Sequence, residues 1–344
     1  MLSDQQFNEN PSGIFNEQEI TKIETTDRAV KRLFFLLLCF LFLHAAVARA
    51  QTQPLQEIIV STGDSITVGY PYCTGQTAEG CICEGCYVPR VMALSRIPTT
   101  NVGWKYSETA YERYMIDTHL NQYKPAILTI YSGNNDILYG TASQDVIDAI
   151  NNLTFIVDHC LAYGTRPVIA TLGPQFREDL AFRQPYILQI NQGIRQLAAS
   201  RGIAVADIGS ALWGQQQYFT SDGIHPNLAG HAVIANLFYQ AINQCAYDIS
   251  PSSAYFSGSG GTGSVSVTSS TGSLCSWKAV SHVDWIVVTG GSSGAGSGTV
   301  SYQVAYNNTG RERTGTLTIA WRTFTVNQKK APALNFLPLL LDEE

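Results

Sequence analysis

Short apolar runs alternate with longer amphipathic segments between residues 55 and 246. Each run is rich in β-branched residues, and the segment that follows is long enough for a crossover helix. Continuous apolar runs are typical of parallel strands buried on both faces, and helical spacing of apolar residues indicates helices packed on the sheet. The predicted strands are 57–61, 100–104, 125–131, 166–172 and 203–209, and the predicted helices are 144–163, 183–201 and 228–245. Residues 55–246 are therefore predicted to form a three-layer α/β/α domain.

The pattern changes to strict alternation of apolar and polar residues after residue 250. Short alternating runs separated by Gly and Asn clusters predict a small all-β sandwich over residues 250–328. The Ser/Gly-rich stretch near residues 257–264 is expected to be an exposed linker. Residues 329–344 form a C-terminal tail that is too short to span a bilayer. Period-2 alternation places four residues on one face of the sandwich: Val300, Tyr302, Val304 and Tyr306.

The first 50 residues are predicted to be an extended leader with a signal peptide. Residues 33–43 are wholly apolar, Lys31 and Arg32 precede them, and a small-x-small cleavage signal ends at Ala50. The alternative, a membrane anchor, is disfavoured because the apolar stretch spans about 16 residues and a spanning helix needs about 20. We therefore expect an exported protein, secreted or held in the periplasm or at the cell surface of a bacterium.

The charge balance excludes nucleic acid as a partner. The 344 residues contain 21 Lys and Arg against 27 Asp and Glu, a formal net charge of -6. Binding to nucleic acid depends on basic residues that displace phosphate counterions, and the sequence contains no basic stripe.

Four cysteines crowd one loop: Cys73, Cys81, Cys83 and Cys86. Thiols at such short spacing could bind zinc or an iron-sulfur cluster, but an exported chain meets an oxidising environment in which thiols pair. Two local disulfides are therefore favoured over a metal site. Seven cysteines follow the signal peptide, so at least one has no partner within the chain.

Three polar motifs follow predicted strands or precede a helix, where open parallel sheets place their reactive groups. Gly63-Asp64-Ser65 follows the first strand, residues 133–136 (GNND) follow the third predicted strand, and residues 222–226 (DGIHP) precede the last helix. A serine hydroxyl becomes a nucleophile when a base accepts its proton, and His225 is a suitable base. Asp222 can accept the other imidazole N–H. Asn135 and the Ser65 backbone N–H can stabilise an oxyanion, so these groups together favour hydrolysis of an acyl ester.

In the order and type of these motifs, residues 57–245 resemble the SGNH/GDSL hydrolase family. The resemblance implies a flavodoxin-like fold, with Ser65 as nucleophile, Asp222 and His225 as the other members of the triad, and Asn135 as an oxyanion donor. The family has a further glycine whose backbone N–H completes the oxyanion hole. This sequence departs there: Gly103 comes too early, and Ser107 stands at about the expected distance before Asn135, so Ser107 is preferred over Gly103.

The second domain resembles the BACON domain, an immunoglobulin-like β-sandwich attached to secreted carbohydrate-active enzymes. The resemblance covers nearly all of residues 250–328 and suggests a polysaccharide or glycoprotein surface as partner. Three tryptophans could stack on sugars, but packing in the core is the favoured role for all of them: Trp277, Trp285 and Trp321.

The sequence thus predicts an exported serine esterase that cleaves acetyl or short-chain acyl esters of small molecules or glycans. No metal or cofactor is expected in its chemistry. Two alternatives stay open: a non-catalytic adhesin that binds surfaces or carbohydrates on a hydrolase-like scaffold, and a lipase or lysophospholipase acting on lipid acyl esters.

Overall fold

The computed structural model describes residues 55–78, 83–137, 143–269 and 275–332. The predicted leader and signal peptide, and all but the first residues of the predicted tail, lie outside these ranges. Residues Gln51–Glu344 group as one unit, separate from Met1–Ala50. Within the described ranges, no helix has both the length and the apolar character needed to cross a membrane.

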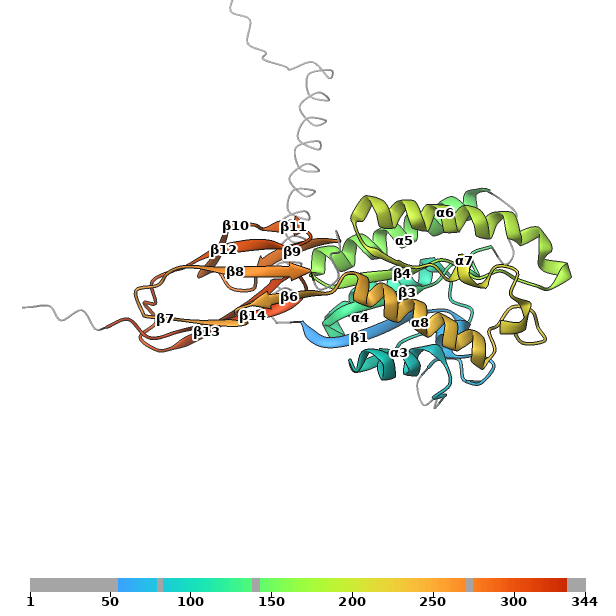
Figure 1. The fold of residues 1–344 in the computed structure, drawn as a ribbon, viewed down its shortest axis with the longest axis horizontal. Coiled ribbons are helices and arrows are strands. Elements are labelled where there is room, and N and C mark those ends of the chain that lie inside the picture. The colour runs from blue at the N-terminus through green and yellow to red at the C-terminus, as the bar shows by residue number, and fades with distance from the viewer. Residues whose placement is uncertain (1–54, 79–82, 138–142, 270–274, 333–344) are drawn as a thin grey trace, which may run out of the picture. The chain divides into compact units, whose positions relative to one another are not determined.

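The first domain is built on a five-stranded parallel sheet with the order β2-β1-β3-β4-β5 (Figure 1). Its central strands consist largely of buried residues, and the burial of β4 is complete. This explains why the strands read as continuous apolar runs. The strands are β1 (Gln56–Gly63), β2 (Thr99–Asn101), β3 (Pro125–Tyr131), β4 (Arg166–Ala170) and β5 (Ala204–Ala206).

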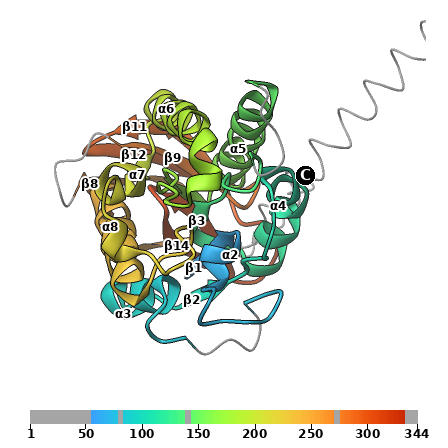
Figure 2. The same cartoon turned by 90° about the vertical axis from the view of Figure 1, so that its right-hand side faces the viewer.

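Helices cover both faces of this sheet, with α4, α5 and α6 along one side and α3 and α8 along the other (Figure 2). The predicted three-layer α/β/α fold is thus confirmed. The long helices are α3 (Tyr87–Ser95), α4 (Thr109–Tyr123), α5 (Ser143–Tyr163), α6 (Gln184–Arg201) and α8 (Leu228–Gln244). The short ones are α2 (Ser65–Val68), α7 (Ile208–Leu212) and the 3₁₀ turns η1 (Glu178–Arg183) and η2 (Gln216–Tyr218).

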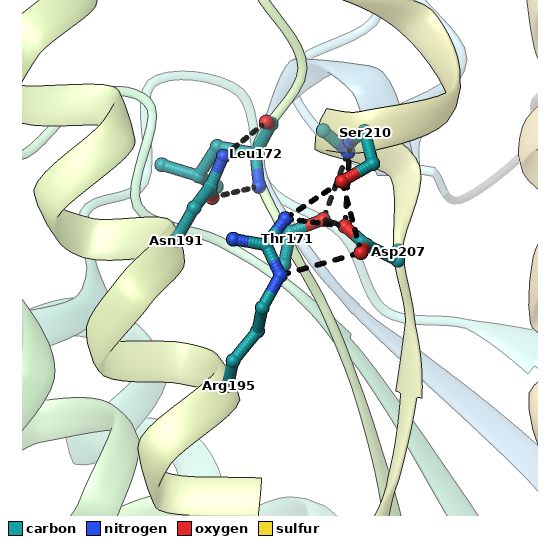
Figure 3. Close-up of polar contacts among 7 residues, drawn as sticks. Thr171, Leu172, Asn191, Arg195, Asp207 and Ser210 are labelled. Atoms are coloured by element: carbon teal, nitrogen blue, oxygen red, sulfur yellow. Dashed lines mark hydrogen bonds and ion pairs between the residues drawn. The ribbon is translucent and has the colours of Figure 1, made fainter.

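A polar network fixes the loops at the carboxyl ends of β4 and β5 (Figure 3). The carboxylate of Asp207 accepts hydrogen bonds from Thr171 Oγ1 at 2.8 Å and from Arg195 Nη2 at 2.7 Å. The side chain of Asn191 bonds both the N–H of Leu172, at 2.6 Å, and its carbonyl oxygen, at 2.9 Å. Helix α6 is therefore tied to the loop that leaves β4, and this loop continues into the cavity described below.

The second domain consists of two β-sheets, which confirms the predicted all-β class. One sheet has the order β10-β12-β8-β6 and the other β11-β9-β13-β14-β7. The first sheet contains β6 (Tyr247–Ser250), β8 (Gly261–Ser269), β10 (Ile286–Gly290) and β12 (Gly298–Val304). The second contains β7 (Ser253–Phe256), β9 (Ser276–Ser281), β11 (Ser293–Ala295), β13 (Arg313–Ile319) and β14 (Arg322–Gln328).

The Ser/Gly-rich stretch is not a linker, and this prediction was wrong. Residues 257–264 join β7 to β8 and enter β8 itself, which pairs with both β6 and β12. The alternation continues through the small residues of β8, whose Val265 and Val267 are buried in the core. The small polar residues that alternate with them, Ser264, Ser266 and Thr268, occupy exposed positions, where a strand tolerates them.

The aromatic residues of the sandwich follow the prediction with one exception. Trp277 is buried, and Trp285 and Trp321 are partly buried against the core. Val300, Tyr302 and Val304, which alternate along β12, are all buried. Tyr306 does not share their face, because β12 ends at Val304 and the Tyr306 side chain is exposed.

The cysteines are largely in disulfides. Cys83 bonds to Cys86, as the prediction of local bonds within the loop requires, and Cys73 is disulfide-bonded as well. Cys81 lies outside the described residues. A further bond, Cys245–Cys275, links the end of α8 to the residue before β9. Cys160 is a free thiol, buried in α5.

Replacing Cys245 and Cys275 together by serine should destabilise the protein by about 2–4 kcal/mol, because the bond closes a loop with a sequence separation of 30. Thermal unfolding followed by circular dichroism measures the effect. The matched control replaces Cys83 and Cys86, whose separation of 3 constrains the unfolded chain much less. A loss for the control as large as for the Cys245 and Cys275 pair would contradict the expectation.

Candidate active site

Ser65 lies two residues after the end of β1, as the first residue of the short helix α2. The turn that exposes it requires glycine at position 63, because φ there is +149° and an added Cβ would lie 2.1 Å from the carbonyl oxygen of Tyr131. The buried carboxyl of Asp64 caps α2 by accepting the Ile66 N–H at 2.9 Å. Asp64 also accepts a hydrogen bond from Asn134 Nδ2 at 3.1 Å, and burial raises its pKa. The turn after β1 is therefore tied to the loop after β3.

Ser65, His225 and Asp222 form a continuous hydrogen-bonded chain. The Oγ of Ser65 lies 2.9 Å from Nε2 of His225, and Nδ1 of the same ring lies 2.8 Å from Oδ2 of Asp222. The structure thus brings together three residues that the sequence separates by up to 160 positions. Tyr70 packs its ring edge to face with the imidazole, with 4.6 Å between ring centroids. The geometry is that of a nucleophile, a base and a group that orients the base.

Asp222 is held in its ionised form. Its partial burial raises the pKa, but hydrogen bonds from the N–H groups of His225 and Ile224, from the imidazole and from Thr220 outweigh burial and lower the pKa to about 2. A carboxylate that stays ionised accepts a hydrogen bond from the Nδ1–H of His225 and leaves Nε2 as the acceptor for the Ser65 hydroxyl.

A cavity of about 350 Å³ opens beside Ser65 and His225. Most of the residues that line it are polar or charged, and they include Asn134, Asn135, Gln175, Arg177 and Arg183. The apolar and aromatic residues of its described lining are Ile66, Tyr70, Tyr106 and Ile224. Such a lining suits a ligand with several hydrogen-bonding groups.

Of the predicted oxyanion donors, Asn135 lines this cavity, whereas Ser107 and Gly103 do not. Asn135 lines it, and its Nδ2 also donates to the carbonyl oxygen of Ser107 at 2.9 Å. The backbone N–H of Ser107 is used in a turn, where it donates to Trp104 O at 3.1 Å, and the N–H of Gly103 donates to Oδ1 of Asn101. Neither Ser107 nor Gly103 is part of the described lining.

Tyr106, one residue before Ser107, does line the cavity. The N–H groups of Trp104 and Lys105 donate to Gly63 O and Gln76 O, so both are engaged elsewhere. The N–H of Tyr106 donates no hydrogen bond within the described part of the chain. Tyr106 has a φ of +63° at the third position of the turn, which reverses the central peptide as in a type II turn.

Two carboxyls, one buried and one partly buried, support this turn, and the sequence singled out neither as a site residue. Glu112 of α4 accepts hydrogen bonds from Thr62 and, at 2.9 Å, from Ser107 Oγ; burial raises its pKa to about 7. Asp136, expected only to support a turn, accepts the N–H of Thr109 at 3.0 Å; burial raises its pKa to about 6. The start of α4 is thus bonded to the end of β1 and to the loop after β3.

Replacing Glu112 by Gln should remove a pH-dependent loss of stability. The folded-state pKa of about 7 lies above the ordinary value of 4.5, so the folded protein retains a proton that the unfolded chain loses first. The stability contribution is full below about pH 4.5 and is lost as the pH rises through 7, a change on the order of 3 kcal/mol.

Urea unfolding at pH 5 and at pH 8 measures this difference in wild type and in Glu112→Gln. Glu108→Gln is the control, because it removes a carboxylate from an exposed position at the start of the same helix. The same pH dependence in Glu112→Gln and in wild type would count against the raised pKa.

Comparison with known proteins agrees with this description. A family model described as the GDSL-like lipase/acylhydrolase family matches residues 62–233. A second model, the viral BACON domain, matches residues 246–329. A search of curated proteins finds no match.

Several solved structures are similar to part of the chain. TesA is 21% identical, with 54% of this chain and 97% of that chain covered and a TM-score of 0.44. A member of the lipolytic protein G-D-S-L family from Veillonella parvula is 20% identical, with 53% and 96% covered and a TM-score of 0.45. A catalytic mutant of Axe2, an acetylxylan esterase from Geobacillus stearothermophilus, is 19% identical, with 56% and 96% covered and a TM-score of 0.46.

The family model spans half of the chain and includes the segments that carry Ser65, Asn135, Asp222 and His225. This chain therefore belongs to the GDSL-like lipase/acylhydrolase family.

Proposed function

We propose that the protein is an exported serine esterase that hydrolyses acetyl or other short-chain acyl esters. The observation that carries the proposal is the chain of two hydrogen bonds, 2.9 Å and 2.8 Å long, that joins Ser65 to His225 and His225 to Asp222 beside a cavity. This arrangement can transfer the hydroxyl proton of Ser65 to His225 as the serine oxygen attacks a carbonyl carbon.

In the proposed reaction, Ser65 Oγ bonds to the ester carbonyl carbon while Nε2 of His225 takes the hydroxyl proton. The resulting imidazolium lies against the ionised Asp222 and then donates its proton to the departing alcohol oxygen. A water molecule repeats the sequence on the acyl-serine, with His225 again accepting the proton. The products are a carboxylic acid and an alcohol, and the enzyme returns to its starting state.

The oxyanion that forms in each half-reaction needs donors fixed in advance. We assign this role to the backbone N–H groups of Ser65 and Tyr106 and to the side-chain amide of Asn135. The sequence favoured Ser107 over Gly103, but the turn engages the Ser107 N–H and leaves that of Tyr106 uncommitted within the described residues. The proposed backbone donor is therefore Tyr106 instead of Ser107.

The residue types that line the cavity favour short acyl groups over long ones. A lipid acyl chain gains most of its binding free energy from contact with apolar side chains, and the only aliphatic side chains of the described lining are Ile66 and Ile224. The complete and hydrogen-bonded triad also argues against a purely adhesive role. Export is supported by the signal-like segment at residues 33–50 and by the disulfides.

We also propose that the β-sandwich directs the enzyme to a carbohydrate or cell surface. The resemblance to carbohydrate-associated modules supports this role. Trp277 is buried, and Trp285 and Trp321 pack against the core, so the surface contacts are assigned to other residues of the sandwich.

Replacing Ser65 by alanine should lower the turnover of a short-chain aryl ester by on the order of 10⁶-fold, because no other group in the site can form the acyl intermediate. A fluorophosphonate should label the wild type once, at Ser65, as measured by intact mass and peptide mapping. The matched control is Ser132→Ala: Ser132 directly follows β3, and its buried hydroxyl has no hydrogen-bond partner among the described residues. Full activity in Ser65→Ala would refute the assignment.

Replacing Asn135 by alanine should lower kcat by about 100-fold with a smaller change in KM, because the amide is expected to contact the transition state rather than the bound ester. Steady-state kinetics on the same ester measure both constants, and a melting curve checks the fold. A rise in KM at constant kcat would instead place Asn135 in substrate binding.

A further inference from the structure

Tyr106 occupies a backbone position that favours glycine. Its φ of +63° lies in the left-handed region, at the third residue of the turn from Trp104 to Ser107. A type II turn usually has Gly or Asn there, because a Cβ is disfavoured at positive φ. A bulky residue at this position costs conformational free energy, which other interactions have to offset.

Packing within the protein does not account for the tyrosine. The side chain of Tyr106 is 73% exposed, so little of its apolar surface is buried. Among the described residues its ring stacks on no other ring, whereas the neighbouring Trp104 packs against Tyr111 with 5.5 Å between centroids. The fold therefore gains little from a ring at position 106, and a bound ligand is the remaining partner.

The location of Tyr106 identifies that ligand as substrate. Tyr106 lines the cavity that contains Ser65 and His225. On the same wall, Lys105 Nζ lies 4.4 Å from the centre of the Tyr70 ring, and that ring packs on His225. Tyr70 is thus engaged with Lys105 and with the imidazole, whereas the Tyr106 ring is exposed.

The chemistry of the lining indicates what this ring contacts. Asn134, Gln175 and Arg177 supply hydrogen-bonding groups to the same cavity. A pyranose ring presents a flat face of C–H groups, which packs on an aromatic ring, and a rim of hydroxyls, which bond to polar side chains. A hydrocarbon chain would displace water from these polar groups without offering them hydrogen bonds, at a cost in free energy.

We propose that Tyr106 is a specificity-determining residue whose ring packs against the sugar ring of an acylated carbohydrate, on the alcohol side of the ester. This inference rests on the proposed esterase function and refines it. The side chain selects the alcohol, while the backbone N–H of the same residue faces the developing oxyanion. One turn thus couples recognition of the sugar to the position of the carbonyl.

The test compares two acetate esters with the full-length protein. One is an acetylated methyl glycoside, and the other is ethyl acetate, whose alcohol is too small to reach the ring; released acetate is measured for both. Tyr106→Gly keeps the backbone N–H and the positive φ but removes the ring. For this variant, kcat/KM on the glycoside should fall about tenfold more than kcat/KM on ethyl acetate, mainly through KM.

Two further variants complete the comparison. Tyr106→Phe keeps the flat ring and should retain the wild-type preference for the glycoside. Tyr114→Ala is the matched control, because Tyr114 is an equally exposed tyrosine of α4 that is absent from the cavity lining. It should leave both reactions unchanged.

Equal losses on the two esters in Tyr106→Gly would overturn the inference, since they would indicate a role of the turn alone. A wild type that cleaves ethyl acetate but not the glycoside would overturn the inference and leave the esterase proposal standing. Absence of Ser65-dependent cleavage of either ester would overturn both.

Discussion

The hydrogen bond between Asp64 and Asn134 joins the two strand ends on which the site depends. Asp64 precedes Ser65, the proposed nucleophile, and Asn134 precedes Asn135, the proposed oxyanion donor, so this bond of 3.1 Å links the two segments that carry them. The Asp64 carboxyl is almost fully buried, and a buried carboxyl is stable only when its oxygens have partners. Parallel strands bring their carboxyl ends to the same edge, and the buried acid then fixes the loops there relative to each other.

Two further acids fix the turn that contains Tyr106 through hydrogen bonds of their carboxyl groups. Glu112 bonds to Thr62 of β1 and to Ser107, and Asp136 of the loop after β3 bonds to Thr109 at the start of α4. Burial raises the pKa of both, which shows that their charged forms lack the solvation of an exposed carboxyl. The segment between β2 and α4 is thereby attached to β1 and to the loop after β3. This attachment holds the left-handed conformation of Tyr106, a conformation that an isolated turn would seldom keep with a tyrosine.

Helix α8 connects the segment that contains His225 to the sandwich. It begins directly after Asn227, whose side chain caps it by accepting the N–H groups of Ala229 and Gly230, and His225 lies two residues before that cap. The helix ends at Gln244, and the next residue, Cys245, forms the disulfide to Cys275. The segment that positions the imidazole is therefore covalently continuous with the sandwich and cross-linked to it, with no flexible linker between them.

The sequence by itself determined the features that depend on local periodicity and spacing. Helices α5, α6 and α8 and the buried strands could be predicted because their apolar residues repeat along the chain, and Asp222 and His225 because three positions separate the two partners. The tertiary structure alone decided the roles of Glu112 and Tyr106. Glu112 lies in a helix with few apolar residues, and its partner Thr62 is 50 positions away, so no local pattern marks it as buried. The choice between Ser107 and Tyr106 depended on which backbone N–H donates a hydrogen bond within the turn. Periodicity records which face of an element is buried, whereas hydrogen bonding of buried polar groups depends on residues that only folding brings together.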